Sequence, residues 1–352
     1  MDTSVSPKAL VFDWGDTLMT TFPDFQGAMV DWPVVAAEDG APAALVQLKG
    51  HYRLLVGTNA ANSSASQVLA ALQRVGLGQS IERVFTVHEL GSRKPEAAFY
   101  QALQAQTGLS AGELVMIGDD YSVDVLGAWQ AGWRSVWYNP KGKPAPGLLP
   151  VQDLEIKHLS ELPAALETTP LPRLADCLAW LQREGASAGL LAHIQAVAAL
   201  AYQMALWLRA AGEAIDPLLA QRGGLLHDLA KLSPGEKDHG KRAAEILLKC
   251  GQPALAEITD RHLLHRVLTA AEAPRTWEEK LVYLADKMVE GSRVVTLDER
   301  LSSLHRRYPH IAAIIDGAAP HARAIQHAVC ARLGFADEDL TSRLTEAMRR
   351  AG

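Results

Sequence analysis

Residues 9–18 read ALVFDWGDTL, an apolar block that ends in acidic and polar residues. Four comparable blocks follow: YRLLVGT (52–58), ERVFTV (82–87), LVMIGD (114–119) and RSVWYN (134–139). Short apolar blocks of this kind are typical of strands that are buried on both faces of a parallel sheet. We therefore predict that residues 9–15 form the first strand of such a sheet.

Amphipathic segments separate these blocks, for example SASQVLAALQRVG (64–76) and PEAAFYQALQAQTG (95–108). Both have the periodicity of a helix that buries one face. Strands that alternate with helices predict a doubly wound α/β domain. The Pro- and Gly-rich stretch 139–150 predicts a surface loop, and segment 156–167 is expected to return to the same domain.

The second half of the chain has a different pattern. From about residue 173 onward, helical periods follow one another, with breaks at Gly212, residues 233–235, residues 251–253 and Pro274. We predict a multidomain chain with an α/β doubly wound parallel sheet over residues 1–168, a linker over 169–173 and an all-α domain over 174–352.

Composition narrows the class of protein. The 352 residues carry a formal net charge of −6 and only 6% aromatic side chains. Proteins that coat nucleic acid need a basic surface, so we expect no stable nucleic-acid binding. The three cysteines (177, 250 and 330) are widely spaced and predict no disulfide framework. Because free thiols are usual in a reducing compartment, and no secretory signal is visible, we expect a cytoplasmic location.

Residues 187–207 are apolar almost throughout and are long enough to span a bilayer. The stretch carries His193, Gln195 and Gln203, however, and polar groups are rare inside lipid. We therefore expect a buried helix of the all-α domain and no membrane contact.

Chemically reactive side chains follow the predicted strands: Asp13 and Asp16 after the first, Thr58 and Asn59 after the second, Lys94 beyond the third, and Asp119 and Asp124 after the fourth. Ligands bind at the carboxyl ends of parallel strands. Carboxylates can hold Mg²⁺, a lysine and a hydroxyl can hold phosphate oxygens, and a carboxylate that faces the phosphate can attack it. The pattern predicts a phosphate site at this edge.

This half resembles the haloacid-dehalogenase-like (HAD) hydrolase superfamily over residues 8–167, through FDWGDTL, VGTN, RKP and IGDDYSVDVLGAWQAG. The resemblance implies a Mg²⁺-dependent site. In that site Asp13 is nucleophile and metal ligand, Lys94 is catalytic, Thr58, Asn59 and Lys94 bind phosphate, and Asp119 and Asp124 bind Mg²⁺.

Two features depart from the HAD pattern. The family's second acid, which protonates the leaving group and activates water, is replaced by Gly15, and Asp16 stands one place further on. A shift of one residue along an extended strand turns a side chain to the other face, so Asp16 does not simply substitute. The intervals between Asp13, Thr58 and Lys94 also leave no room for a large cap.

The all-α half contains ionisable residues inside apolar helical sequence: His193, His227, Asp228, His239, His262 and Asp286. Buried ionisable groups are costly unless they are paired or bind a metal. Imidazole with carboxylate suits Mn²⁺, Fe²⁺, Co²⁺, Ni²⁺ or Zn²⁺. Adjacent helical residues point about 100° apart. His227 and Asp228 can therefore bind one ion together only if that ion lies near a helix end or bridges the two side chains.

This half resembles the HD-domain metal-dependent phosphohydrolases over about residues 174–305, with the pattern His193, His227-Asp228 and Asp286. The resemblance implies a divalent metal held by these residues, with Asp228 catalytic and Lys231, in HDLAK, acting on phosphate. His239 and His262 resemble the branch with two metals, which includes dinucleoside-tetraphosphate hydrolases. We expect His265, His305, His310, His321 and His327 to be solvent or packing residues.

The sequence thus predicts a phosphohydrolase for phosphate esters or anhydrides, with a small phosphorylated substrate such as a nucleotide. One alternative is that the HAD-like half only binds a phosphorylated metabolite, and regulates or scaffolds the other half. A third reading, in which neither half is an enzyme, requires the His/Asp cluster to be free of metal.

Overall fold

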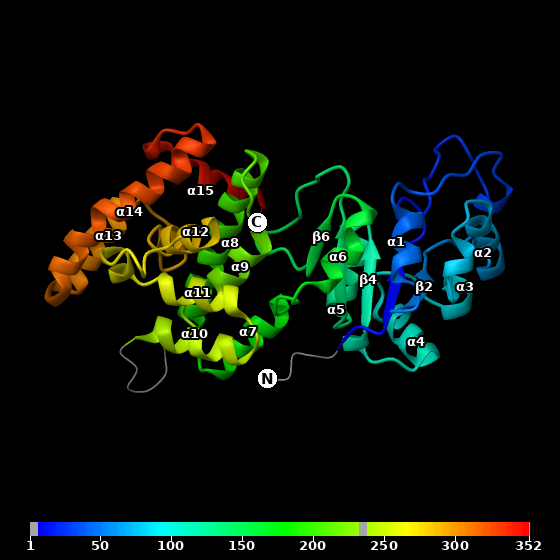
Figure 1. The fold of residues 1–352 in the computed structure, drawn as a ribbon, viewed down its shortest axis with the longest axis horizontal. Coiled ribbons are helices and arrows are strands. Elements are labelled where there is room, and N and C mark those ends of the chain that lie inside the picture. Colours follow the sequence, from blue (N-terminus) through cyan, green and yellow to red (C-terminus); the bar gives the residue numbers. More distant parts are fainter. Residues whose placement is uncertain (1–5, 232–237, 352) are drawn as a thin grey trace. The chain divides into compact units, whose positions relative to one another are not determined.

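The computed structural model describes residues 6–231 and 238–351, which divide into two compact units (Figure 1). The α/β unit contains residues 6–146 and 151–173, and the helical unit contains residues 147–150 and 174–351. The predicted linker, 169–173, is grouped with the α/β unit. The predicted domain limits at 168 and 174 stay a proposal.

The α/β unit is built on a sheet of six parallel strands in the order β3-β2-β1-β4-β5-β6. The strands are β1 (Ala9–Phe12), β2 (Arg53–Gly57), β3 (Arg83–Phe85), β4 (Leu114–Gly118), β5 (Arg134–Tyr138) and β6 (Leu154–Ile156). The predicted α/β parallel sheet is confirmed. The sequence did not predict β6, because a strand of three residues at a sheet edge is too short to form a pattern.

Alternate residues of β1 supply two cores. Leu10 and Phe12 pack on one face with residues of α1 and α2, whereas Ala9 and Val11 pack on the other with residues of α4. The helices of this unit are α1 (Ala41–Leu48), α2 (Ala65–Arg74), α3 (Val87–Leu90), α4 (Ala97–Thr107), α5 (Leu126–Gln130) and α6 (Leu162–Glu167). Both faces of the sheet are therefore covered, and the strand ends remain as the place for a site.

β1 lies between β2 and β4, with Phe12 in register with Val56 and Ile117. Asp13, the next residue, therefore leaves the sheet at the middle of its carboxyl edge. The strand order reverses at this position, which is where doubly wound sheets form a ligand crevice.

The helical unit consists of α7 (Leu174–Arg183), α8 (Ala188–Ala210), α9 (Pro217–Leu226), α10 (His239–Lys249), α11 (Pro253–Arg261), α12 (Trp277–Asp286), α13 (Leu297–Arg307), α14 (Ala312–Leu333) and α15 (Leu340–Ala351). Three predicted breaks, at Gly212, residues 251–253 and Pro274, lie at or between these helices. The fourth, at 233–235, lies outside the described residues. The predicted all-α class is confirmed for the bulk of the unit.

One detail of the helical unit differs from the prediction. The strand pattern was expected to end before residue 173, yet β7 (Val289–Glu290) and β8 (Arg293–Val294) form an antiparallel hairpin. Gly291 turns the chain at a φ of +63°, a conformation that favours glycine. Strands of two residues carry no readable alternation, which is why the sequence did not reveal them.

Within the described residues, α8 is the one helix long and apolar enough to cross a membrane. Of its most apolar 18-residue window, 61% is buried inside the unit, and it packs against α9 and α12. This is the burial of a core helix.

Candidate metal and phosphate sites

The α/β unit gathers acids around one buried lysine at the carboxyl edge of the sheet. Lys94 Nζ lies 2.6 Å from Asp13 Oδ1 and 2.6 Å from Asp124 Oδ1, and its side chain is only 1% exposed. Thr17 donates a hydrogen bond of 3.2 Å to Asp119 Oδ1. One oxygen from each of Asp13, Asp119 and Asp124 lies within 4.8 Å of the others. The structure therefore brings these predicted site residues together.

The charges in this cluster do not balance. Burial and the charge of Asp13 raise the pKa of Asp119 to about 6. Burial also raises the pKa of Asp124, although Lys94 opposes that shift. Three carboxylates thus face one ammonium group, and the oxygens suit a hard divalent cation such as Mg²⁺.

Thr58 and Asn59 follow β2, next to Asp13 in the sheet. Thr58 is buried, and its hydroxyl accepts a hydrogen bond from the backbone of Ala60. Asn59 donates to the carbonyl of Lys94 at 2.9 Å and accepts from the Lys94 amide at 2.8 Å. The expected phosphate contact of Asn59 therefore competes with these bonds, and in this structure Asn59 positions the loop that carries Lys94.

Thr21 packs where the side chain of the missing acid would begin at position 15. A Cβ added to Gly15 would lie 2.9 Å from Cγ2 of Thr21. Thr21 also donates its hydroxyl to Asp16 Oδ2 at 2.5 Å and its amide to Asp16 Oδ1 at 2.9 Å. Asp16 adopts a left-handed φ of 54°. Both oxygens of Asp16 are thus engaged by Thr21.

In the helical unit, the predicted ligands lie at the ends of packed helices. His193 lies in α8, and His227 and Asp228 directly follow α9. His239 begins α10, His262 follows α11 and Asp286 ends α12. His227 is the C-cap of α9, so the His-Asp pair is at a helix end, as a shared ion requires.

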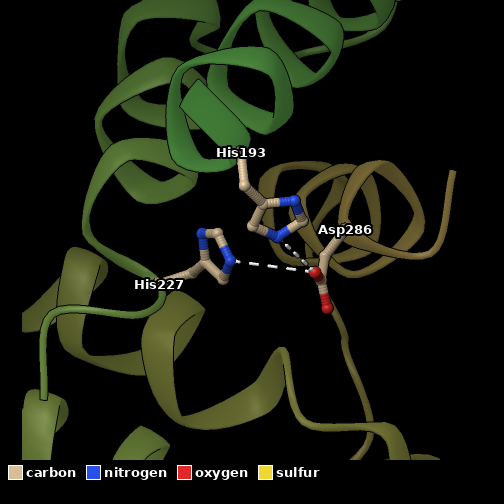
Figure 2. A group of neighbouring side chains, drawn as sticks. All are labelled: His193, His227 and Asp286. Atoms are coloured by element: carbon tan, nitrogen blue, oxygen red, sulfur yellow. Dashed lines mark hydrogen bonds and ion pairs between the residues drawn. The ribbon is translucent and has the colours of Figure 1, made fainter. Parts of the chain in front are cut away.

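A first cluster joins His193, His227 and Asp286 (Figure 2). Asp286 Oδ1 lies 3.1 Å from His193 Nε2 and 3.8 Å from His227 Nε2. The Nδ1 atoms of these histidines contact the carbonyls of Gly291 (3.1 Å) and Gly224 (2.7 Å). A carbonyl at Nδ1 fixes the tautomer that leaves Nε2 open to a metal.

One buried nitrogen atom indicates whether a metal ion fits this site. His227 Nε2 is buried and has no hydrogen-bond partner in the described structure, although carboxylate oxygens of Asp228 and Asp286 lie 3.4 and 3.8 Å away. A buried polar atom without a partner is costly. A divalent ion between this nitrogen and the carboxylates would satisfy it, so the donor set fits.

A second cluster joins His227, Asp228 and His262. Asp228 Oδ1 lies 3.6 Å from His262 Nε2 and 3.1 Å from Nε2 of His239. Burial lowers the pKa of His262 to about 4, so its ring is neutral and can offer a lone pair. Together the two clusters contain five of the six residues predicted as ligands in this half, and the sixth, His239, contacts Asp228.

Two lysines border these clusters. Lys231 Nζ lies 2.5 Å from Asp228 Oδ2, and its side chain is 45% exposed, so it can meet a ligand from solvent. Lys287, which the sequence analysis did not single out, is buried, with Nζ 2.8 Å from Asp286 Oδ2. A lysine after a helix is usually a solvated group near the helix C-terminus, so no signal in the sequence marked it.

Comparisons with known proteins agree with both units. The HAD-hydrolase-like family model matches residues 91–150, and the HD domain model matches residues 190–290. The chain is a fusion of a HAD-like hydrolase domain with an HD domain. Domains of both kinds are typically metal-dependent, and the two family matches support a hydrolase of phosphate esters.

Relatives match parts of the HAD–HD protein. An uncharacterized protein of Methanocaldococcus jannaschii, MJ0778, is 34% identical over 35% of this chain and 82% of its own length. The pyrimidine 5'-nucleotidase PynA of Streptococcus pneumoniae is 35% identical, and the ribulose-1,5-bisphosphate 5-phosphatase of Halopiger xanaduensis is 34% identical, each over 22% of this chain. The chain spans only 35% and 33% of those two enzymes.

Among solved structures, an uncharacterized protein from Listeria monocytogenes serotype 4b matches with 22% identity and a TM-score of 0.40. The match covers 45% of this chain and 96% of that protein.

Proposed function

We propose that the HD unit hydrolyses a phosphoanhydride or phosphate ester, with a nucleotide as the substrate class, at a His/Asp metal centre. The observation that carries the proposal is the buried His227 Nε2, which has no hydrogen-bond partner and lies between the carboxylates of Asp228 and Asp286. The match to a pyrimidine 5'-nucleotidase, which covers 22% of this chain, supports a nucleotide as a substrate of the protein without assigning it to one unit.

Divalent ions, when bound, lower the pKa of water and polarise phosphoryl oxygens. His193, His227 and Asp286 would hold one ion, and Asp228, His262 and His239 would hold a second, with His227 near both. Mn²⁺, Fe²⁺, Co²⁺ and Ni²⁺ suit this mixture of nitrogen and oxygen. Lys231, at the exposed side of Asp228, would bind phosphate oxygens. In the reaction a water oxygen bonds to phosphorus, the bond to the leaving oxygen breaks, and that oxygen takes a proton.

We further propose that the HAD unit binds Mg²⁺ through Asp13, Asp119 and Asp124, and phosphate through Thr58 and Lys94. Asp13 is the candidate nucleophile. Gly15 provides no acid or base, and Asp16 is held by Thr21, so turnover at this site is expected to be slow. The cytoplasmic location stays a prediction, as does the absence of stable nucleic-acid binding.

A substrate screen tests the proposal. Nucleotides, dinucleoside polyphosphates and p-nitrophenyl phosphate are offered to the metal-free chain together with each divalent ion in turn. We expect His227→Ala to abolish nucleotide hydrolysis, whereas Asp13→Asn and the exposed-site control His265→Ala retain it. Nucleotide hydrolysis that persists in His227→Ala would contradict the proposed site. If Asp13→Asn changes only ligand binding, the HAD unit is a binding module, which is the alternative reading of that half.

A further inference from the structure

Lys287 is a buried cation among the metal ligands of the HD unit. It directly follows α12, and its side chain is 4% exposed. Its Nζ donates hydrogen bonds to Asp286 Oδ2 at 2.8 Å and to the carbonyl oxygen of His262 at 2.5 Å. It also lies 4.4 Å from the centre of the Tyr283 ring. An ammonium group at this depth requires such partners, because burial of an unpaired charge is very costly.

The bond to Asp286 decides how that carboxylate faces the first cluster. Oδ2 is occupied by the ammonium group, whereas Oδ1 lies 3.1 Å from His193 Nε2 and 3.8 Å from His227 Nε2. Only one oxygen is thus left for an ion in the first cluster. Lys287 therefore presents Asp286 as a ligand with a single donor atom.

The bond to His262 reaches the second cluster. The His262 ring contacts the Thr259 carbonyl through Nδ1 at 2.6 Å, and its Nε2 lies 3.6 Å from Asp228 Oδ1. Lys287 holds the backbone of the same residue. One ammonium group therefore spans from a ligand of the first cluster to the backbone of a ligand of the second.

We propose that Lys287 is a positioning residue that couples the two metal clusters: it fixes His262 relative to Asp286, so that the second ion binds tightly only while this bridge is intact. The inference rests on the proposed metal centre. Loss of the bridge frees Asp286 Oδ2 for the first ion and releases His262, so the second ion is expected to bind at least tenfold more weakly while the first is retained.

Metal binding, rather than activity, is the test. Co²⁺ is titrated into the metal-free full chain by calorimetry and visible absorption, in an Asp119→Asn background that weakens the Mg²⁺ site of the other unit. The variants are Lys287→Met and the matched control Lys280→Met, which changes a lysine within α12 that lies over Trp277. We expect two ions in the parent and in Lys280→Met. In Lys287→Met we expect one tight ion and one weakened at least tenfold.

Other outcomes separate the possibilities. Two ions with parental affinities in Lys287→Met, or equal weakening of both ions, overturn the coupling role. A parent that binds one ion overturns the coupling but leaves a metal centre, and a parent that binds none overturns the proposed function as well. Circular dichroism establishes that each variant is folded. If Lys287→Met is not, Lys287→Gln, which keeps a donor without the charge or the reach to both groups, is judged by the same outcomes.

Discussion

Asp286 Oδ1 lies 3.1 Å from His193 Nε2, although 93 positions separate the two residues in the chain. The contact joins the end of α12 to the side of α8, and these two helices pack together in the core of the HD unit. Both helices are buried along their apolar faces, and their packing places the two side chains against one another.

We expect Asp286→Asn to lower metal-dependent hydrolysis by at least a hundredfold, because it removes the negative charge that both histidines of the first cluster face. Changes to residues that only support a metal ligand lower activity by roughly ten- to a hundredfold. The loss of a ligand itself should have a larger effect. Steady-state kinetics with saturating Mn²⁺ provides the measurement. The control is Asp298→Asn, an exposed acid paired with Arg323, and equal losses in both variants would argue against a metal role for Asp286.

Restoring the second acid of the HAD unit is expected to need two changes. Gly15→Asp alone should lower the melting temperature, because its Cβ would meet the methyl group of Thr21 at 2.9 Å. Gly15→Asp with Thr21→Ser removes that methyl group. In a His227→Ala background, the double variant is expected to hydrolyse p-nitrophenyl phosphate at least tenfold faster than the parent, since general acid–base catalysis supplies about 10²–10⁴-fold. An unchanged rate would mean that the natural site already works by other means.

Lys94→Met should destabilise the HAD unit by about 3–5 kcal/mol, the usual effect of removing one partner from a buried ion pair. Added Mg²⁺ should restore part of this loss, because a ligand that binds the folded state stabilises it. Lys8→Met is the matched control, since Lys8 also lies 2.6 Å from a carboxylate, that of Glu113, but is 64% exposed. Surface pairs contribute about 1 kcal/mol or less. Urea unfolding measures the free energy of unfolding of both variants. Equal losses of this free energy would contradict the prediction that the buried ion pairs of Lys94 contribute more than the exposed pair of Lys8.

We expect the metal-free HD unit to lose stability at acid pH, because His262 is buried in its fold. Its pKa is near 6.5 when unfolded and about 4 when folded, because burial disfavours the charged ring. The unfolded chain therefore takes up the proton first, and stability falls as the pH decreases from about 6.5 to about 4. The full effect is of the order of 3 kcal/mol. In the presence of EDTA, the free energy of unfolding of His262→Gln should depend less on pH than that of the parent. The same pH dependence in the variant and the parent would contradict the prediction.

Much of the architecture could be predicted from the sequence because it depends on local patterns. The apolar blocks at 9–15 and 114–119 correspond to β1 and β4, and the helical periods of the second half correspond to its helices. Short elements were missed: β6 and the β7–β8 hairpin have too few residues to show a period. Asp13, Lys94 and Asp119 could be placed at one sheet edge because parallel strands bring their carboxyl ends together.

Contacts between distant side chains depended on the fold itself. The sequence contains Thr21, yet only the turn of the chain after Asp16 places its methyl group where a side chain at position 15 would lie. Lys287 resembles a surface lysine until α11 and α12 pack and enclose it. Residue types and their periods determined which elements form and which chemistry is available. Tertiary packing decided which atoms meet, because burial depends on partners that lie far away in the chain.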